Sequence, residues 1–279
     1  MSLYNDSFRM RYKSLPIAIS ESHAHFDTKP HIHSEIELLS VKQGKARISV
    51  GDKCYSVDAG ELVIVNPMEV HSIICDREIP YYQRCICFDL SFLPDKNLVD
   101  DLCMGRCFVE HYFPKESTVT SGISEYFDKM LDSVNKSDDT LIFDGTAYAS
   151  LIFSELKRNG LIVRKNSSGK RTDFVFEVKE YLSKHFAESI SSENVASELY
   201  YTQSYFCRLF RKNFGTSFWK YLLMYRISKA KALIEDDTLK ISEIAEKVGI
   251  TDQSYFSKCF KQLVGVSPMQ YKKCQCNST

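Results

Sequence analysis

The sequence predicts an α+β protein with a β-rich N-terminal domain and an all-α C-terminal domain. Between residues 17 and 89, short apolar segments alternate with turn residues, whereas from about residue 122 onward apolar residues recur at helical spacing. In the last third, the stretches 204–217 and 254–267 are close copies of each other. A repeat of this kind indicates one small helical unit that is made twice.

The N-terminal segments are short and evenly spaced, as in a β-barrel or β-sandwich. Gly44, Gly51, Gly60 and Pro67 lie between them and supply turn residues. The expected strands cover residues 17–26, 35–41, 46–50, 53–57, 61–66, 70–75 and 81–89.

A helical hairpin is expected after the strands, over about residues 122–160. Residues 164–172 are small, polar and basic without an apolar anchor, which is typical of a flexible linker. We therefore expect a first domain of residues 1–163, a linker of residues 164–172 and a second domain of residues 173–279.

The two copies share an aromatic pair, a Phe one turn later, a basic residue and a Gly that ends the helix. These positions are Tyr205, Phe206, Phe210, Arg211 and Gly215 in the first copy, and Tyr255, Phe256, Phe260, Lys261 and Gly265 in the second. Each copy follows a short helix and a tight turn. The sequence thus predicts two helix-turn-helix motifs, at about 192–214 and 241–264.

Charge is unevenly distributed, although the net charge is zero. From residue 164 onward there are 19 Lys and Arg against 12 Asp and Glu, whereas the first 163 residues carry 17 against 24. The C-terminal part therefore has the sign that a polyanionic partner requires.

A helix-turn-helix motif presents the start of its second helix to the major groove of DNA. Gln can pair with adenine and Arg with guanine, while other basic side chains contact phosphate. The alternatives are a helical bundle with a solvated basic face and a helical protein-interaction module. The candidate DNA-binding residues are Thr202, Gln203, Ser204, Cys207, Arg208, Arg211, Lys212, Asp252, Gln253, Ser254, Ser257, Lys258 and Lys261.

At these residues the chain resembles the AraC/XylS family of transcriptional regulators, over about residues 174–273. The resemblance includes Ala196, the connecting helix from Arg226 to Ile234, and the run from Ile244 to Tyr271. It implies two recognition helices in successive major-groove segments, a homodimer formed through the hairpin, a small effector such as a sugar, and activation more often than repression. Promoter DNA and RNA polymerase are the implied macromolecular partners.

The resemblance has three small departures. Lys272 stands where Arg often follows the final Tyr, Cys259 occupies a place that is usually aliphatic, and Cys207 lies at a candidate base-contacting position.

A second resemblance lies in the N-terminal domain, where the run from His31 to Glu37 and the run from Gly60 to His71 are similar to the two motifs of the cupin barrel. His31, His33 and Glu37 are separated by even numbers, so one strand face can hold all three, and His71 can approach from a neighbouring strand. Strict alternation would also point Glu35 inward, so we expect a bulge there.

Three imidazoles and a carboxylate can bind Zn, Fe, Mn or Ni, so His31, His33, Glu37 and His71 are candidate metal ligands. Three alternatives stay open: the histidines can bind a polar effector without metal, satisfy core polar groups, or have no present role. The further candidates for an effector pocket are His23, His25, Arg47, Tyr82 and Arg84.

These observations favour a regulator over an enzyme. The rival interpretation is a metal-dependent cupin enzyme, such as an oxygenase or sugar isomerase, that carries a DNA-binding appendage. It uses the same histidines and Glu37.

The ten cysteines lie mostly in apolar segments, and Cys85-Ile-Cys87 lacks the CxxC spacing of zinc sites. We therefore expect buried thiols and no cysteine metal site. No apolar run is long enough to span a membrane and no secretory signal is visible, so the expected location is the cytoplasm, without a membrane partner.

Overall fold

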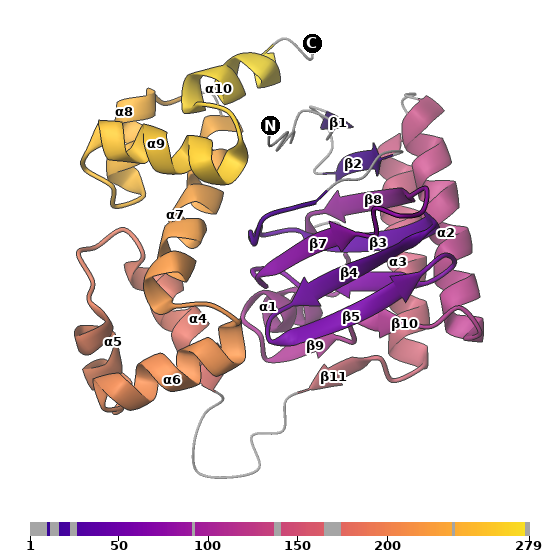
Figure 1. Ribbon diagram of the computed structural model, residues 1–279, viewed down its shortest axis with the longest axis horizontal. Helices are drawn as coiled ribbons and strands as arrows, with labels where there is room; N and C mark the ends of the chain where they lie inside the picture. The colour runs from indigo at the N-terminus through magenta and orange to yellow at the C-terminus, as the bar shows by residue number, and fades with distance from the viewer. Residues whose placement is uncertain are drawn as a thin grey trace.

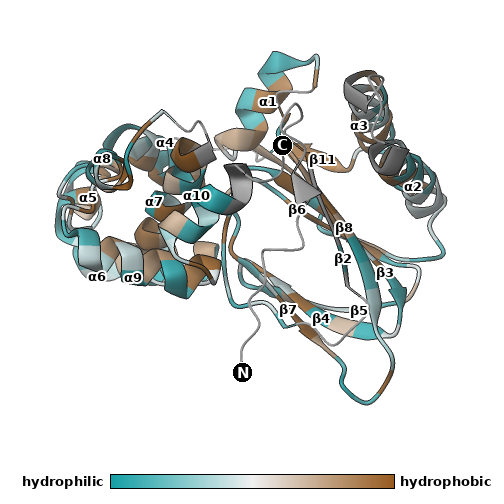
Figure 2. Cartoon of the chain, turned by 90° about the horizontal axis from the view of Figure 1, so that it is seen from above, coloured by the Kyte–Doolittle hydropathy of each residue, from teal (hydrophilic) through white to brown (hydrophobic). Residues whose placement is uncertain are grey.

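The computed structural model describes residues 10–11, 17–22, 27–90, 93–136, 141–164, 174–235 and 238–276. A β-rich domain and an α-helical domain lie side by side (Figure 1). Viewed from above, α2 and α3 cover one sheet, and a second sheet lies on that sheet's other face (Figure 2). The prediction of an α+β fold is confirmed.

The β-rich domain contains antiparallel sheets in the orders β1-β2-β8-β3-β6-β10, β5-β4-β7 and β11-β9. The strands are β1 (Met10–Arg11), β2 (Ile17–Ser22), β3 (Ile36–Gln43), β4 (Lys45–Val50), β5 (Lys53–Asp58), β6 (Leu62–Val65), β7 (His71–Cys75), β8 (Tyr82–Phe88), β9 (Cys107–Val109), β10 (Tyr112–Phe113) and β11 (Ile162–Arg164). Each expected segment contains a strand, with its ends shifted by a few residues.

The larger sheet is buried on both faces. Along β3, Leu38 packs toward the helices, whereas Leu39 packs into the layer between the sheets. Along β8, Ile86 likewise packs toward the helices, and Cys85 packs into the layer between the sheets. This alternation follows from the two-residue repeat of a strand and explains why most residues of β3 and β8 are buried, on whichever face they lie.

The helices are α1 (Lys96–Cys103), α2 (Thr118–Lys136), α3 (Leu141–Arg158), α4 (Phe174–His185), α5 (Ser192–Glu198), α6 (Gln203–Phe214), α7 (Phe218–Glu235), α8 (Ile241–Lys247), α9 (Gln253–Val264) and α10 (Pro268–Cys276). Helices α2 and α3 pack against each other as the expected hairpin. None of the described helices is long and apolar enough to cross a bilayer.

The α-helical domain contains two helix-turn-helix units, α5–α6 and α8–α9, joined by α7. In α6, Phe206, Phe210 and Phe214 recur every fourth residue and are buried on one face. Helix α6 ends at Gly215 and α9 ends at Gly265, both in the left-handed conformation that glycine favours.

The core of the first helix-turn-helix unit extends into the β-rich domain. Ile32, Met68 and Val70 belong to the same buried cluster as residues of α4, α6 and α7. At the same contact, the turn after β4 lies so close to the end of α6 that a Cβ atom on Gly215 would clash with the carbonyl oxygen of Gly51. The two domains are therefore packed together through apolar side chains and main chain.

Candidate functional site

Four potential metal ligands come together in the β-rich domain. His31 and His71 form an isolated antiparallel bridge, with main-chain hydrogen bonds of 3.1 and 3.0 Å. His33 follows two residues after His31, and Glu37 is the second residue of β3. One ligand atom of each of the four side chains lies within 4.8 Å of the other three.

The even sequence spacing is not what brings these residues together. Strand β3 begins only at Ile36, and a bend at Ser34 and Glu35 separates it from the histidines. The expectation that His31, His33 and Glu37 share one strand was therefore wrong, because the bridge to β7 and the bend create the arrangement. The bend takes the place of the bulge that Glu35 was expected to require.

Main-chain carbonyl groups orient all three imidazole rings. In each ring, Nδ1 lies close to a carbonyl oxygen two residues away in the sequence. A carbonyl oxygen only accepts, so Nδ1 carries the proton and a neutral ring presents its Nε2 lone pair. The distances are 2.9 Å from His31 to Lys29, 3.0 Å from His33 to Glu35 and 3.0 Å from His71 to Glu69.

The Glu37 carboxylate faces these nitrogens. Its Oε2 atom is 2.6 Å from Nε2 of His33 and 3.2 Å from Nε2 of His71. The side chains of Glu37, His33 and His71 are at most 5% exposed, and Nε2 of His71 has no hydrogen-bond partner among the described residues. Because lone pairs on nitrogen and oxygen repel at such distances, a proton or a metal ion must lie between these atoms.

The donor set fits a divalent transition metal. Imidazole nitrogen with one carboxylate oxygen is a common ligand set for Zn, Fe, Mn and Ni. Orientation of the rings through Nδ1–H bonds to carbonyl groups is the usual outer-shell arrangement for histidine ligands. The partner-free Nε2 of His71 is the observation that tests this fit, since a buried imidazole nitrogen is normally hydrogen-bonded.

Other residues predicted for an effector pocket lie elsewhere. Arg47 is exposed on β4, between the buried Ala46 and Ile48. Arg84 lies on the helix-facing side of β8 and forms ion pairs with Glu21 and Asp128, at 2.8 and 3.0 Å.

Tyr82 lies two residues before Arg84 on β8 and therefore points to the same face of the sheet. The structure therefore separates Arg47, Tyr82 and Arg84 from the histidine cluster, because neighbouring strand residues point to opposite faces. His23 and His25 lie outside the described residues.

The loop between β6 and β7 connects the cluster to the α-helical domain. The Met68 N–H donates to the carbonyl oxygen of His33 at 2.8 Å. From the other domain, Tyr221 Oη donates to the Met68 carbonyl and Lys179 Nζ to the Pro67 carbonyl, each at 3.0 Å. Met68 has a φ of 61°, a conformation that costs about 1–2 kcal/mol for a residue with a side chain.

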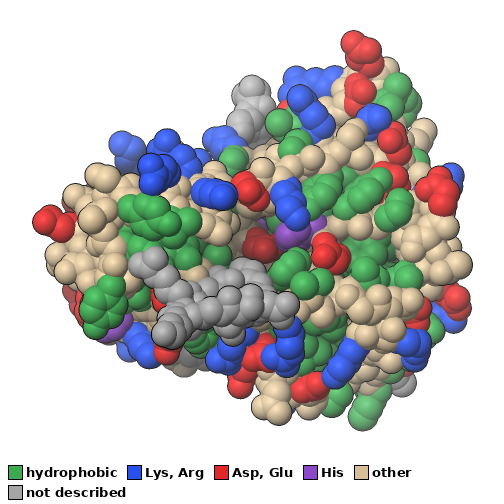
Figure 3. All heavy atoms as spheres, turned by 90° about the horizontal axis from the view of Figure 1, so that it is seen from below, with side chains coloured by type: hydrophobic (Ala, Val, Ile, Leu, Met, Phe, Trp, Pro, Cys, Tyr) green, Lys and Arg blue, Asp and Glu red, His purple; other side chains and the backbone are tan. Residues whose placement is uncertain are grey.

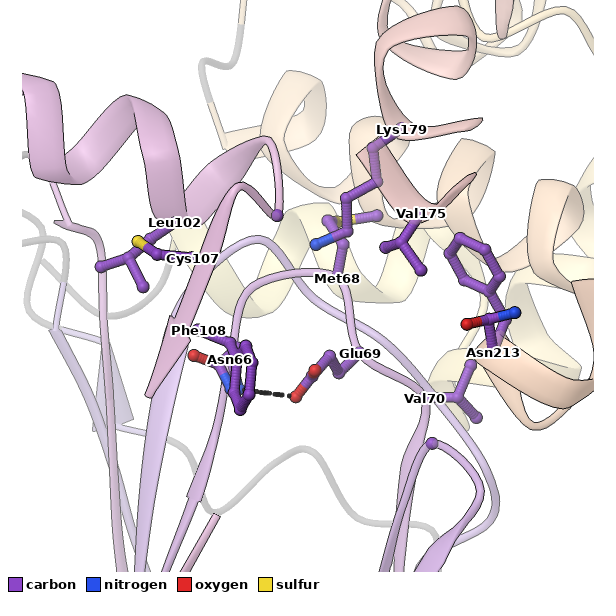
Figure 4. A pocket seen from close by; sticks show the side chains of 13 residues that line it. Asn66, Met68, Glu69, Val70, Leu102, Cys107, Phe108, Val175, Lys179 and Asn213 are labelled. Atoms are coloured by element: carbon purple, nitrogen blue, oxygen red, sulfur yellow. Dashed lines mark hydrogen bonds between the residues drawn. The ribbon is translucent and has the colours of Figure 1, made fainter. Parts of the chain in front are cut away.

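A cavity of about 60 Å³ lies at this contact between the domains (Figure 4). Its lining includes Glu69, whose carboxylate accepts from Asn66 at 3.2 Å and contacts His111 Nε2 at 2.8 Å. Burial alone would raise the pKa of Glu69, but the hydrogen bond and charge of His111 and the charge of Lys179 hold it below its ordinary value. Neither this cavity nor Glu69 was expected from the sequence.

The two recognition helices present their polar residues to solvent. Figure 2 shows α6 and α9 on the same face of the helical domain, and Figure 1 shows them toward opposite ends of α7. Basic side chains gather along one edge of this domain (Figure 3). The exposed candidates are Thr202, Gln203, Ser204, Cys207, Arg208, Arg211, Lys212, Asp252, Gln253, Ser254, Lys258 and Lys261, while Ser257 is half-buried.

Some of these side chains already have partners. Asp252 Oδ1 accepts from the Tyr255 N–H at 2.9 Å and thus caps α9. Gln203 Nε2 donates to the Ser192 hydroxyl at 3.1 Å, whereas Thr202 makes no capping hydrogen bond. The Arg208 guanidinium lies 5.3 Å from the centre of the Tyr205 ring, so it is held at the surface of α6.

A β-rich domain with a buried donor cluster, joined to two helix-turn-helix units, defines a class of ligand-responsive DNA-binding regulator. The family comparisons agree with this class. A model described as an AraC-like ligand binding domain matches residues 16–143, and one described as a helix-turn-helix domain matches residues 195–273.

Curated relatives extend the match over most of the chain. The probable transcriptional regulator LumQ of Photobacterium leiognathi is 33% identical over 244 residues, which are 87% of this chain and 91% of LumQ. The Msm operon regulatory protein of Streptococcus mutans is 24% identical over 247 residues, 88% of this chain and 86% of that protein. The chain therefore belongs to the AraC family of transcriptional regulators, and it is not an enzyme.

A solved structure shares the overall fold. An apo ToxT variant from Vibrio cholerae superposes with a TM-score of 0.57 at 15% identity, covering 95% of this chain and all of that one. At this identity the likeness concerns the fold alone. It supports the order of a β-rich domain followed by a helical DNA-binding domain.

Proposed function

We propose that this chain is a transcriptional activator that senses its effector at a metal centre formed by His31, His33, Glu37 and His71. The observation that supports this proposal is the convergence of the Nε2 atoms of His33 and His71 on one buried carboxylate, with a ligand atom of His31 within 4.8 Å. In all three rings, Nδ1 is hydrogen-bonded to a carbonyl oxygen. These lone pairs would hold a divalent Zn, Fe, Mn or Ni ion, whose charge would offset that of the buried carboxylate.

The effector that we propose is a sugar or related metabolite. Hydroxyl and carboxylate oxygens of a small metabolite can complete the coordination of such an ion. His31 is the partly exposed member of the cluster, so an effector would approach from its side. The family resemblance also favours this class of effector.

The effector signal would reach the DNA-binding domain through the loop between β6 and β7. A movement of His33 changes the hydrogen bond from the Met68 N–H, and Met68 is in turn held by Tyr221 of α7. Binding would thus shift the population between arrangements of the first helix-turn-helix unit relative to the β-rich domain.

We propose that the chain acts as a homodimer assembled through the hairpin of α2 and α3. Phe143, Ala147 and Leu151 lie four residues apart on α3 and are exposed, with Phe143 at 75% and Leu151 at 42%. An exposed apolar strip of this kind is typical of a protein interface. Two chains would bring two pairs of recognition helices to one promoter and raise affinity through effective concentration.

The DNA target is double-stranded promoter DNA, and activation implies RNA polymerase as a further partner. Because both act on the chromosome of a bacterial cell, we propose a cytoplasmic location. The recognition residues differ between the two units, since α6 presents Cys207 and Arg208 where α9 presents Ser257 and Lys258. The two units would therefore read different bases.

The experiment combines metal analysis with DNA binding. Target DNA is first selected from a random pool, and affinity is then measured for the metal-loaded and the chelator-treated full-length protein. We expect a stoichiometric metal and an affinity that changes on chelation in the wild type but not in His33→Gln. His185→Gln, the same change at a half-buried histidine outside the cluster, is the control and should behave like wild type.

Two results would contradict the proposal. The metal centre would be wrong if His33→Gln bound metal like the wild type. DNA recognition would be wrong if selection returned no preferred sequence.

A further inference from the structure

Cys85 and Cys87 lie against the same carboxylate as the histidines. They alternate along β8, so both face the layer between the sheets, and each side chain is 1% exposed. Strand β8 pairs with β3 so that Cys87 is directly opposite Glu37. The Cys85 Sγ atom lies 2.9 Å from Glu37 Oε1.

The two oxygen atoms of Glu37 therefore face two different sets of donors. Oε2 lies against His33 and His71, whereas Oε1 lies against Cys85. A ligand atom of Glu37 and the sulfur atoms of Cys85 and Cys87 all lie within 4.8 Å of one another. A carboxylate with one donor set on each oxygen has the arrangement of a bridging ligand.

The spacing of the two sulfur atoms suits coordination. Residues two apart on a strand have Cα atoms about 6.6 Å apart, yet the Sγ atoms of Cys85 and Cys87 are 3.8 Å apart. Two thiolates bound tetrahedrally at about 2.3 Å from one zinc ion are separated by about 3.8 Å. The side chains thus converge to the separation that a single thiophilic ion requires.

We propose that Glu37, Cys85 and Cys87 form a second metal position, which takes a thiophilic cation such as Zn(II), Co(II) or Cd(II). Glu37 bridges this position and the histidine cluster. Binding converts both thiols to thiolates and releases their two protons to solvent. The inference extends the proposed function, because it shares Glu37 with the proposed effector centre, but its sulfur ligands are independent of the histidines.

The spacing of the motif explains why the sequence did not indicate this position. A CxxC pair suits a turn, whereas a CxC pair places both sulfurs on one face only when the segment is a strand. On β8, the alternation that buries Cys85 and Cys87 also aims them at Glu37. Both residues are buried thiols, as expected, and the proposal gives them a ligand role in addition.

Cobalt(II) titration of the metal-free full-length protein provides the test, because a thiolate bound to cobalt gives a near-ultraviolet charge-transfer band that imidazole and carboxylate do not give. For the wild type we expect two equivalents bound, together with this band. Cys85→Ser and Cys87→Ser should each lose the band and one equivalent. Cys75→Ser, a change at another buried cysteine of the same layer, should keep the charge-transfer band and bind two equivalents of cobalt.

His33→Gln separates this inference from the proposed function. It should lose one equivalent and keep the charge-transfer band. The inference is overturned if the wild type shows no band, if the band survives in Cys85→Ser and Cys87→Ser, or if His33→Gln loses it. Binding of one equivalent without the band, lost in His33→Gln, would leave the proposed function standing alone. Circular dichroism of each variant verifies its fold.

Discussion

Tyr221 on α7 donates a hydrogen bond of 3.0 Å to the carbonyl oxygen of Met68, in the loop that leads to His71. Tyr221 is fully buried, and burial raises the pKa of its phenol well above the ordinary value, so the group remains a donor at neutral pH. Since the Met68 N–H donates to the carbonyl oxygen of His33, a single residue, Met68, links the histidine cluster to the DNA-binding domain.

Tyr221→Phe should lower the free energy of unfolding by about 1–3 kcal/mol, because the Met68 carbonyl loses its buried donor. It should also weaken the effect of the effector on DNA affinity. Urea unfolding and DNA titrations measure the two quantities. Tyr225→Phe, the same change one turn along α7, should leave the effector response intact. Equal responses in wild type and Tyr221→Phe would argue against transmission through this bond.

Gly215→Ala should disrupt the contact between the domains. Gly215 and Gly160 have nearly the same positive φ, 68° and 69°, so alanine costs about 1–2 kcal/mol in backbone strain at either position. At Gly215 the new methyl group would meet Gly51, whereas at Gly160 no atom of the described residues lies within 4 Å of the added Cβ. Small-angle scattering should show a larger radius of gyration for Gly215→Ala than for Gly160→Ala. Identical profiles would contradict the close contact.

Arg208→Ala should weaken binding to a selected site by about 1–3 kcal/mol if Arg208 reads a base. An equal loss on random DNA would show that Arg208 contacts only phosphate. Lys184→Ala is the control, because Lys184 is an exposed basic residue that is not part of either recognition helix and is paired with Glu180. Fluorescence anisotropy at fixed salt measures both affinities.

Metal binding should stabilise the folded chain. At a free metal concentration a thousandfold above Kd, the free energy of unfolding should rise by about 4 kcal/mol. Thermal unfolding with and without chelator measures this change, with His185→Gln as the control. If His33→Gln gained as much stability from the metal as wild type does, the ion would bind elsewhere.

Phe143→Asp combined with Leu151→Asp should convert a dimer into monomers, because two charges would enter the proposed interface. Sedimentation equilibrium measures the mass. Ile74→Asp tests an exposed apolar residue on β7, at 45% exposure, and should leave the mass unchanged. Loss of the dimer through Ile74→Asp alone would place the interface on the other sheet.

Much of the fold was predictable because its signals are local. Alternating and helical periods, with Gly215 and Gly265 as helix ends, located the main strands and both helix-turn-helix units. Helix α1 and the short strands β9, β10 and β11 were missed. Strands of two or three residues are too short for a period, and α1 is short and largely polar.

The candidate site was only partly predictable. His31, His33, Glu37 and His71 were found through a resemblance, but the bend at Ser34 that positions them has no periodic signal. The prediction placed Arg47, Tyr82 and Arg84 in the pocket, and this was wrong. Alternation along a strand shows which residues share a face, but the sequence does not show which of the two faces lines the pocket. The roles of Glu69 and Lys179 depend on a contact between segments far apart in the sequence.

The shared core of Ile32, Met68 and Val70 with the first helix-turn-helix unit has a consequence for biosynthesis. The β-rich domain leaves the ribosome first, and domains generally fold as they emerge. Its apolar loop can then serve as a template for α4 and α6 before α8 and α9 have been translated. Among the described residues, the core of the second unit is formed with α7, Phe186 and Tyr271 and includes no residue of the β-rich domain. The first DNA-binding unit can therefore complete its packing before the second unit has been synthesised.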